Sequence, residues 1–351
     1  MSASPTSRRV NSQTTLAQIA AESNVSISAV SRILGGKKVD TFSSETVERV
    51  KAAAEKLRYR PNRLVRGIQT GRTGLVGVVI PAYSDFYNLV MAGIHDHLVK
   101  HDRLPVVLWS GSDAIGEYRR SELEQIHSLV DLRVEGVILK PVFDAASDQY
   151  LHELIDRKIP LVVVDRALPR VNACFVGSDD DAGMAKALEF LKSLGHRHIA
   201  YFGPETTIST GAQRLQAFRL FMAQEPRMRA VECLTKDWRA LPKDALECLS
   251  KASQATAIVA VDDLFARAVC EAAKSLGRRV PQDLSVVGHG DLAVARFGAP
   301  TLTTVDQHPY EIGKSAARRL LARVEDPTES CRKVLIPPSL TIRESTGPAE
   351  I

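Results

Sequence analysis

Residues 15–34, TLAQIAAESNVSISAVSRIL, contain two short helical patterns separated by a break at Ser23-Asn24-Val25. Apolar residues recur at helical spacing in each half, and Thr15 and Ser26 stand directly before the two patterns, where such residues cap helices. Gly35-Gly36 is expected to end the second helix, because glycine adopts the left-handed conformation found past helix C-termini. This stretch therefore predicts a pair of short helices joined by a tight turn.

The region around this pair is small, helical and basic. A third helix is expected from Ser43 to Leu57, and Pro61 stops it because proline disfavours helix in the residue before it. Residues 1–72 contain 13 Lys and Arg against 5 Asp and Glu, and the rest contains 33 against 36, which gives the net charge of +5. The excess positive charge indicates a nucleic-acid-binding head. A basic solvated surface is the alternative explanation.

From Gly74 onward, apolar strand patterns alternate with amphipathic helices. Continuous apolar runs rich in valine and isoleucine are typical of strands buried on both faces of a parallel sheet. Because the alternation is too long for one compact sheet, we expect an α/β body of two doubly wound lobes. Helices are expected at 182–194 and 263–276, each ended by a glycine, Gly195 or Gly277. The strand candidates are 75–80, 105–109, 134–139, 160–164, 198–202, 256–261 and 284–288.

Composition excludes several classes of protein. No apolar run approaches the ~20 residues that span a membrane, and the polar N-terminus lacks the apolar core of a signal peptide. Five scattered cysteines favour free thiols in a reducing cytoplasm over a disulfide framework. The sequence contains none of the catalytic or phosphate-binding motifs that we considered, so we expect neither enzymatic activity nor a cofactor. For Asp179-Asp180-Asp181 we favour a helix N-terminus over a metal site, and for His196 and His198 a structural role over zinc.

The ordered set of motifs resembles the LacI/GalR family of bacterial transcriptional regulators. In the head these are Thr15-Leu-Ala-Gln-Ile-Ala, Val25-Ser-Ile-Ser-Ala-Val-Ser-Arg32 and Tyr59-Arg-Pro-Asn62. The body adds, in the family's order, Leu194-Gly-His-Arg-His-Ile, Gly203-Pro204, Val261-Asp-Asp, Pro281-x-Asp-Leu-Ser-Val-Val-Gly288, Pro300-x-Leu-Thr-Thr-Val and Leu340-x-x-Arg-x-Ser-Thr346.

The resemblance implies a domain order. A flexible polar N-terminus at 1–14 precedes a helix-turn-helix DNA-binding domain at 15–60. A hinge helix and linker at 61–73 then leads to a two-lobed effector-binding and dimerisation domain at 74–346, similar to periplasmic sugar-binding proteins, and a tail at 347–351.

For the head, the resemblance implies that the second helix lies in the major groove of DNA. Its groove-facing residues would be Ile27, Ser28 and Ala29, with Arg32 one turn later; Arg32 could bind a guanine or a phosphate. The remaining candidates would contact phosphates and set the register; they are Thr15, Ser26, Ser31 and Tyr59.

The hinge at 62–70 resembles the segment that the family inserts into the minor groove. The inserted apolar side chain falls on Ile68, with Val65 beside it, and Asn62 opens the hinge. Gly67 departs from the pattern, and glycine costs about 1 kcal/mol relative to alanine inside a helix. We therefore expect this hinge helix to form less readily.

For the body, the resemblance implies a small effector, a sugar or sugar derivative, bound between the lobes. Carboxylates would accept hydrogen bonds from hydroxyls, and aromatic rings would cover an apolar sugar face. The sequence has Gly290 where the family commonly places an effector-contacting Asp. The candidate effector residues are Asp85, Phe86, Tyr87, Asp165, Ser178, Arg214, Trp238, Asp262 and Asp291.

Together these patterns predict a cytoplasmic, nucleoid-associated homodimer that binds a pseudo-palindromic operator, most simply as a repressor, with no membrane partner. Two alternatives remain open. A solute-binding protein of the transport type would ignore DNA, and a sugar-processing enzyme on a similar body would show turnover. Neither alternative explains the basic head and the hinge.

Overall fold

The computed structural model describes residues 14–36, 39–60, 67, 72–81, 84–110, 122–141, 148–168, 173–205, 209–236 and 240–349. It divides into two compact units, Met1–Thr73 and Gly74–Ile351. No helix in these ranges is long and apolar enough to cross a membrane. We refer to the first unit as the head and to the second as the body.

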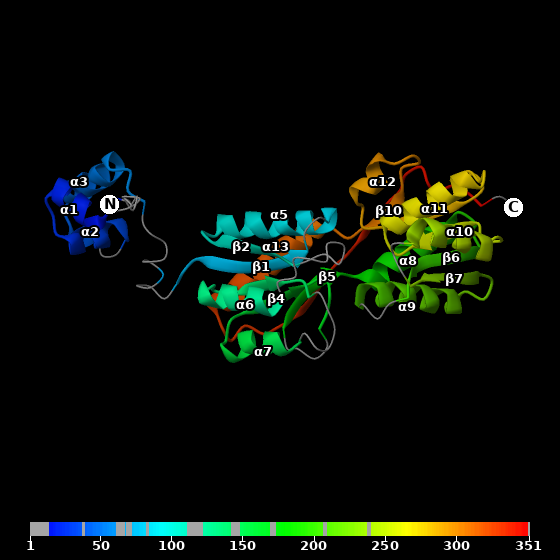
Figure 1. Ribbon diagram of the computed structural model, residues 1–351, viewed down its shortest axis with the longest axis horizontal. Coiled ribbons are helices and arrows are strands. Elements are labelled where there is room, and N and C mark those ends of the chain that lie inside the picture. The colour runs from blue at the N-terminus through cyan, green and yellow to red at the C-terminus, as the bar shows by residue number, and fades with distance from the viewer. Residues whose placement is uncertain are drawn as a thin grey trace, which may run out of the picture. The chain divides into compact units, whose positions relative to one another are not determined.

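The head consists of α1 (Leu16–Ser23), α2 (Ile27–Leu34), the 3-10 turn η1 (Val39–Thr41) and α3 (Ser44–Lys56) around a core of its own (Figure 1). The Thr15 hydroxyl accepts a hydrogen bond from the Gln18 amide in a capping box. The Ser26 hydroxyl caps α2 by accepting a hydrogen bond from the Ala29 amide, so the predicted helix pair is confirmed. At the end of α2, Gly36 has the left-handed φ of 68°.

The first lobe of the body is built on a six-stranded parallel sheet, sheet A, with the order β11-β5-β4-β3-β1-β2. Apolar side chains on one sheet face pack against α5 and α13, and those on the other face pack against α6 and α7. The strands are β1 (Leu75–Pro81), β2 (Leu104–Ser110), β3 (Val137–Leu139), β4 (Leu161–Val164), β5 (Cys174–Ser178) and β11 (Lys333–Ile336). The helices are α5 (Asp85–Lys100), α6 (Glu122–Asp131), α7 (Asp148–Asp156) and α13 (Pro309–Glu325).

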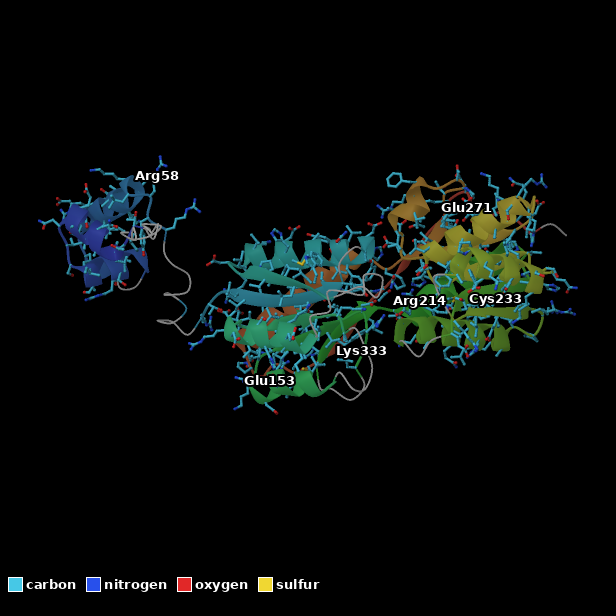
Figure 2. All side chains as sticks on the ribbon, in the orientation of Figure 1. Arg58, Glu153, Arg214, Cys233, Glu271 and Lys333 are labelled. Carbon is cyan, nitrogen blue, oxygen red and sulfur yellow. The ribbon has the colours of Figure 1, made fainter. Side chains whose placement is uncertain are left out.

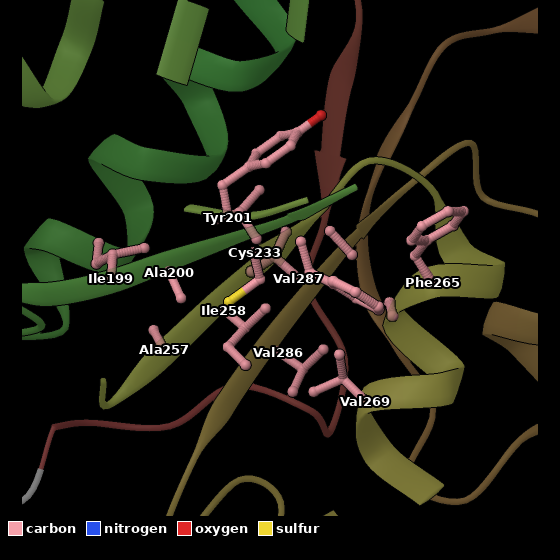
Figure 3. Packing of buried hydrophobic residues seen from close by; sticks show 14 of the residues in the cluster. Ile199, Ala200, Tyr201, Cys233, Ala257, Ile258, Phe265, Val269, Val286 and Val287 are labelled. Atoms are coloured by element: carbon pink, nitrogen blue, oxygen red, sulfur yellow. The ribbon is translucent and has the colours of Figure 1, made fainter. Parts of the chain in front are cut away.

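The second lobe is built on sheet B, with the order β12-β10-β9-β8-β6-β7, in which only β12 is antiparallel to its neighbour. Figure 3 shows its core, where Ile258 and Val286 of the sheet approach Val269 of α11. The strands are β6 (His198–Pro204), β7 (Arg229–Thr235), β8 (Ala257–Ala260), β9 (Ser285–His289), β10 (Thr303–Asp306) and β12 (Ser339–Thr341). The helices are α8 (Asp180–Ser193), α9 (Ser209–Gln224), α10 (Leu241–Lys251), α11 (Asp263–Ser275) and α12 (Ala293–Phe297).

The chain crosses between the lobes three times, from β5 to α8, from β10 to α13, and from β11 to β12. After the second crossing α13 lies beside α5 (Figure 1). This contact needs glycine on both helices, because a Cβ on Gly93 would collide with the Tyr310 carbonyl and one on Gly313 with the Val90 carbonyl. The first lobe is therefore completed by residues far along the chain.

All seven predicted strands are present, and the two-lobed α/β class is confirmed. Gly195 and Gly277 have positive φ after α8 and α11, as predicted. The sequence analysis did not name β5, β7, β10, β11 or β12. Of these, β7 and β12 are edge strands with partly exposed residues, so they lack the continuous apolar run on which the prediction relied.

Candidate functional site

The outer face of α2 in the head is polar and exposed around one apolar side chain. Ile27 is 52% exposed at the first position of the helix, while Val30 and Ile33 fill the head core. The guanidinium of Arg32 donates a hydrogen bond to the Ser28 hydroxyl at 3.2 Å and lies 5.9 Å from the Phe42 ring centroid. The helix thus presents an apolar group, a hydroxyl and a cation on one face.

The other candidate DNA-contact residues differ in how deeply they are buried, and some lie outside the described residues. Ala29 is buried, unlike Ile27 and Ser28, and its amide donates to the Ser26 hydroxyl. Ser31 is half-buried. Tyr59 packs partly against the head core, and burial raises the pKa of its hydroxyl. Asn62, Val65 and Ile68 lie outside the described residues, as do residues 1–13.

Gly67 of the hinge is described. A Cβ there would lie 3.1 Å from the Thr73 Cα, tighter than ordinary contact, so glycine suits the position as it stands.

At the carboxyl edge of sheet A, Tyr87 and Asp165 come together. The Tyr87 hydroxyl donates to Asp165 Oδ2 at 2.6 Å, and the Tyr87 ring meets Phe86 edge-on with centroids 5.2 Å apart. Burial, and then the Asp165 charge, raise the pKa of Tyr87 well above its ordinary value, so it remains a hydrogen-bond donor. Asp85 is exposed at the start of α5.

Two further polar side chains are buried at this edge. Ser178, at the end of β5, is 9% exposed, and its hydroxyl has no hydrogen-bond partner among the described residues. Lys140, directly after β3, is 5% exposed, and its ammonium lies 5.6 Å from the Tyr87 ring centroid. Sequence reasoning missed Lys140, although a lysine that ends an apolar strand run is a recognisable signal.

At the carboxyl edge of sheet B, Arg214 of α9, which is labelled in Figure 2, forms a buried ion pair. Its Nε donates to Asp180 Oδ1 at 2.8 Å and its Nη1 to the Val261 carbonyl at 2.8 Å. Burial alone would raise the pKa of Asp180, but Arg214 and His289 together lower it below the ordinary range. His289 Nε2 lies 3.5 Å from Asp180 Oδ1, and burial, with Arg214, lowers the pKa of this imidazole to about 4. His289 is therefore neutral at physiological pH.

Two further carboxylates of this edge are engaged within the protein. Asp262 caps α11 by accepting from the Phe265 amide at 2.9 Å, and burial raises its pKa. Asp263 accepts from the Thr304 hydroxyl at 2.5 Å and the Leu292 amide at 2.7 Å, and burial raises its pKa to about 6. Trp238 lies outside the described residues.

Asp291 pairs with two arginines of lobe 2. Arg343 donates to its Oδ1 at 2.5 Å and Arg296 to its Oδ2 at 2.8 Å. Gly290 before it has φ 127°, a conformation that disfavours the aspartate expected there. The loop after β9 thus uses its one carboxylate for internal ion pairs.

Two of the three residues in the Asp179–Asp181 run have structural roles. Asp179 accepts from the Ala182 amide at 3.0 Å, which confirms the helix-capping prediction, and Asp180 holds Arg214. Within the described ranges, no three His, Cys, Asp or Glu side chains form a group that could hold a metal ion. His196 bonds Thr256, Ser285 and the Gly347 carbonyl, which is a structural role.

Residues of both lobes line one hollow. Asp165, Ser178 and Lys333 come from lobe 1, and Asp180 and Gln213 come from lobe 2. Carboxylates, a hydroxyl and an amide suit recognition of a molecule with several hydroxyl groups.

Comparison with known proteins explains this combination of head and body. Residues 15–62 match the profile of bacterial regulatory proteins of the lacI family, and residues 188–346 match a periplasmic binding protein-like domain. The chain belongs to the LacI family. It is accordingly a DNA-binding transcriptional regulator and not an enzyme.

Relatives of this LacI-family chain align over nearly its whole length. The ribose operon repressor of Haemophilus influenzae is 28% identical, with 94% of this chain and 98% of the relative covered. The regulator PtxS of Pseudomonas aeruginosa is 29% identical, with 95% and 96% covered.

Solved structures agree with the fold. A CelR–cellobiose complex is 27% identical with a TM-score of 0.67, over 95% of this chain and 100% of that one. The lac repressor dimer bound to operator has a TM-score of 0.81 at 24% identity, over 95% and 99%, which supports the fold.

Proposed function

We propose that this regulator is a cytoplasmic, nucleoid-associated repressor that binds a pseudo-palindromic operator as a homodimer. The observation that carries the proposal is the outer face of α2, where Ile27, Ser28 and Arg32 stand together and exposed on a basic head. A major groove accepts such a helix, and an exposed isoleucine at its start suits a thymine methyl.

In this proposal, different residues of the head make different kinds of contact with DNA. Ile27, Ser28 and Arg32 contact base edges. Phosphate contacts come from Thr15, Ser26, Ser31 and Tyr59, and Ala29 supports α2 from the core side. The hinge at 61–73 contributes Asn62, Val65 and Ile68 to the minor groove.

The body, residues 74–346, binds a sugar or sugar derivative between its lobes and makes the dimer. A CelR structure is described with cellobiose, and a LacI-family regulator from Enterococcus faecium, 26% identical, with ribose. Phe297 of α12, at 88% exposure, is one large apolar side chain that a second copy would cover. The effector site comprises Asp85, Phe86, Tyr87, Asp165, Ser178, Arg214, Trp238, Asp262 and Asp291.

Capture of sheared genomic DNA on the full-length protein, followed by sequencing, tests the proposal. We expect enrichment of a pseudo-palindrome, and loss of that enrichment in Arg32→Ala. Lys51→Ala is the matched control, because Lys51 is an exposed cation on α3. If no site is enriched with or without added cell metabolites, the operator proposal is wrong.

A further inference from the structure

The core of lobe 2 contains two cysteines in contact. Cys233 of β7 and Cys248 of α10 are 5% and 2% exposed, and the Cys233 thiol donates to the Cys248 carbonyl oxygen at 3.6 Å. Figure 3 shows the Cys233 sulfur among the apolar side chains of this core. The two thiols also form a hydrogen bond with each other. Because α10 packs against β7, the fold itself brings the two sulfur atoms together.

The surroundings of the pair favour a thiolate at Cys233. The Cys248 thiol donates to it and lowers the pKa of Cys233 below its ordinary value, and the Lys251 ammonium acts in the same direction against burial. Lys251 is itself fixed, because it donates to the Glu232 carbonyl at 2.8 Å. The hydrogen bond and burial raise the pKa of Cys248 well above its ordinary value, so Cys248 keeps its proton. The pair therefore combines a nucleophilic thiol with a protonated one.

The pair lies under an edge of its sheet. Strand β7 ends the order of sheet B, and Leu234, next to Cys233, is 37% exposed. Regions with few buried contacts open locally at a lower free energy than the rest of a fold, so a small reagent can reach Cys233 while the lobe stays folded. The five cysteines of the chain are free thiols. Disulfides of cytosolic proteins are mostly transient and redox-sensing, so a reversible link is the form expected here.

We propose that Cys233 and Cys248 are a redox-sensitive pair, which hydrogen peroxide oxidises to a disulfide that links β7 to α10. The Cys233 sulfur attacks one peroxide oxygen, so that an S–O bond forms, the O–O bond breaks, and the leaving hydroxide takes up the proton that Cys233 lost. The Cys248 sulfur then attacks the Cys233 sulfur and displaces hydroxide, which leaves as a second water with the Cys248 proton. Two electrons pass from the two sulfurs to the peroxide.

The disulfide would close a short segment of lobe 2. Residues 234–247 lie between the two cysteines and include Trp238, a residue of the proposed effector site. A link between the two ends therefore restrains the segment that contains Trp238. Closing a loop of this length also restricts the unfolded chain, and we expect the oxidised protein to melt about 5 °C or more above the reduced protein.

Peptide mapping of the full-length protein tests the inference. The reduced protein is treated with a small excess of hydrogen peroxide at neutral pH, the remaining thiols are alkylated, and a digest made without reductant is analysed by mass spectrometry. We expect two peptides joined through Cys233 and Cys248, which dithiothreitol separates. The melting temperature of the same sample is expected to rise on oxidation and to return on reduction.

Two variants identify the roles of the thiols. In Cys248→Ala the joined peptides are expected to disappear, and Cys233 is expected to accumulate as a sulfenic acid that dimedone traps. Cys270→Ala is the matched control and is expected to keep the joined peptides. Cys270 belongs to the same core, but burial raises its pKa to about 12 and no cysteine is among the groups that shift it. Operator capture and the melting temperature of the reduced variants report whether they fold.

A second pair of cysteines, in lobe 1, provides the outcome that would overturn the inference. Burial, and then a hydrogen bond with Cys174, raise the pKa of Cys331 to about 11, so Cys331 is the weaker nucleophile although it is the more exposed. The inference is wrong if a Cys174–Cys331 disulfide forms before the Cys233–Cys248 one. It is equally wrong if Cys233 and Cys248 are alkylated as fully after peroxide treatment as before it.

Discussion

The two sheet edges of the body hold their polar groups in different ways. On sheet B, Asp180, Asp263 and Asp291 are satisfied by arginines, a hydroxyl and an amide of the same lobe. On sheet A, the Ser178 hydroxyl lacks a partner among the described residues and α5 begins without a side-chain cap. The comparison indicates that the ion pairs of the sheet B edge contribute to the stability of the folded body, whereas the Ser178 hydroxyl at the sheet A edge contributes little to it.

The largest effect is expected from breaking the ion pair on sheet B. Asp180→Asn leaves the Arg214 guanidinium buried without its counter-charge, which is expected to lower the free energy of unfolding by about 3–5 kcal/mol. Urea unfolding of the full chain measures this. The control is Asp181→Asn, an exposed neighbour, with an expected change within about 0.5 kcal/mol. Equal losses in the two variants would contradict the difference between the edges.

A second effect concerns the pH dependence of the sheet B edge. Burial lowers the pKa of His289 to about 4, below the ordinary 6.5, so the unfolded chain takes up this proton first as the pH falls. The contribution of His289 to the free energy of unfolding is present in full above pH 6.5. As the pH decreases from 6.5 to 4, the free energy of unfolding falls by up to about 3 kcal/mol. Asp263 titrates in the opposite sense near pH 6.

His289→Gln isolates this contribution. We expect the free energies of unfolding of the two proteins, measured from pH 7 down to pH 4, to approach each other as the pH falls. Only the wild type loses the contribution of the histidine over this range. Asp263 and His196 are present in both proteins and cancel in the difference. Parallel curves would show that His289 does not titrate differently on folding.

The smallest effects compare one hydroxyl from each edge. Thr304→Val removes the donor to Asp263 and is expected to cost about 1–2 kcal/mol of stability. Ser178→Ala removes a hydroxyl with no partner among the described residues, so its stability is expected to stay within about 0.5 kcal/mol. Its effector affinity is expected to fall. Chemical unfolding and titration of both variants measure this, and a larger stability loss in Ser178→Ala would reverse the comparison.

The sequence could predict elements but not the pairs that join them. Periodicity and caps located α1, α2 and seven of the strands because these features are local. The Arg214–Asp180 pair joins residues 34 positions apart, and the acidic run containing Asp180 was interpreted only as a helix N-terminus. The burial of Lys140 follows from where β3 lies in the sheet, which composition does not specify. The hinge residues and Trp238 remain predictions.

The three crossings of the chain have a consequence for the order of folding during synthesis. The head closes its core with residues up to Tyr59, so it can fold while the body is still being made. The first lobe is complete only when β11 and α13 have been synthesised, and these two elements follow nearly all of sheet B in the chain. The lobe that emerges first from the ribosome is thus completed among the last, and the part of its apolar surface that α13 covers stays exposed until nearly all of sheet B has been synthesised.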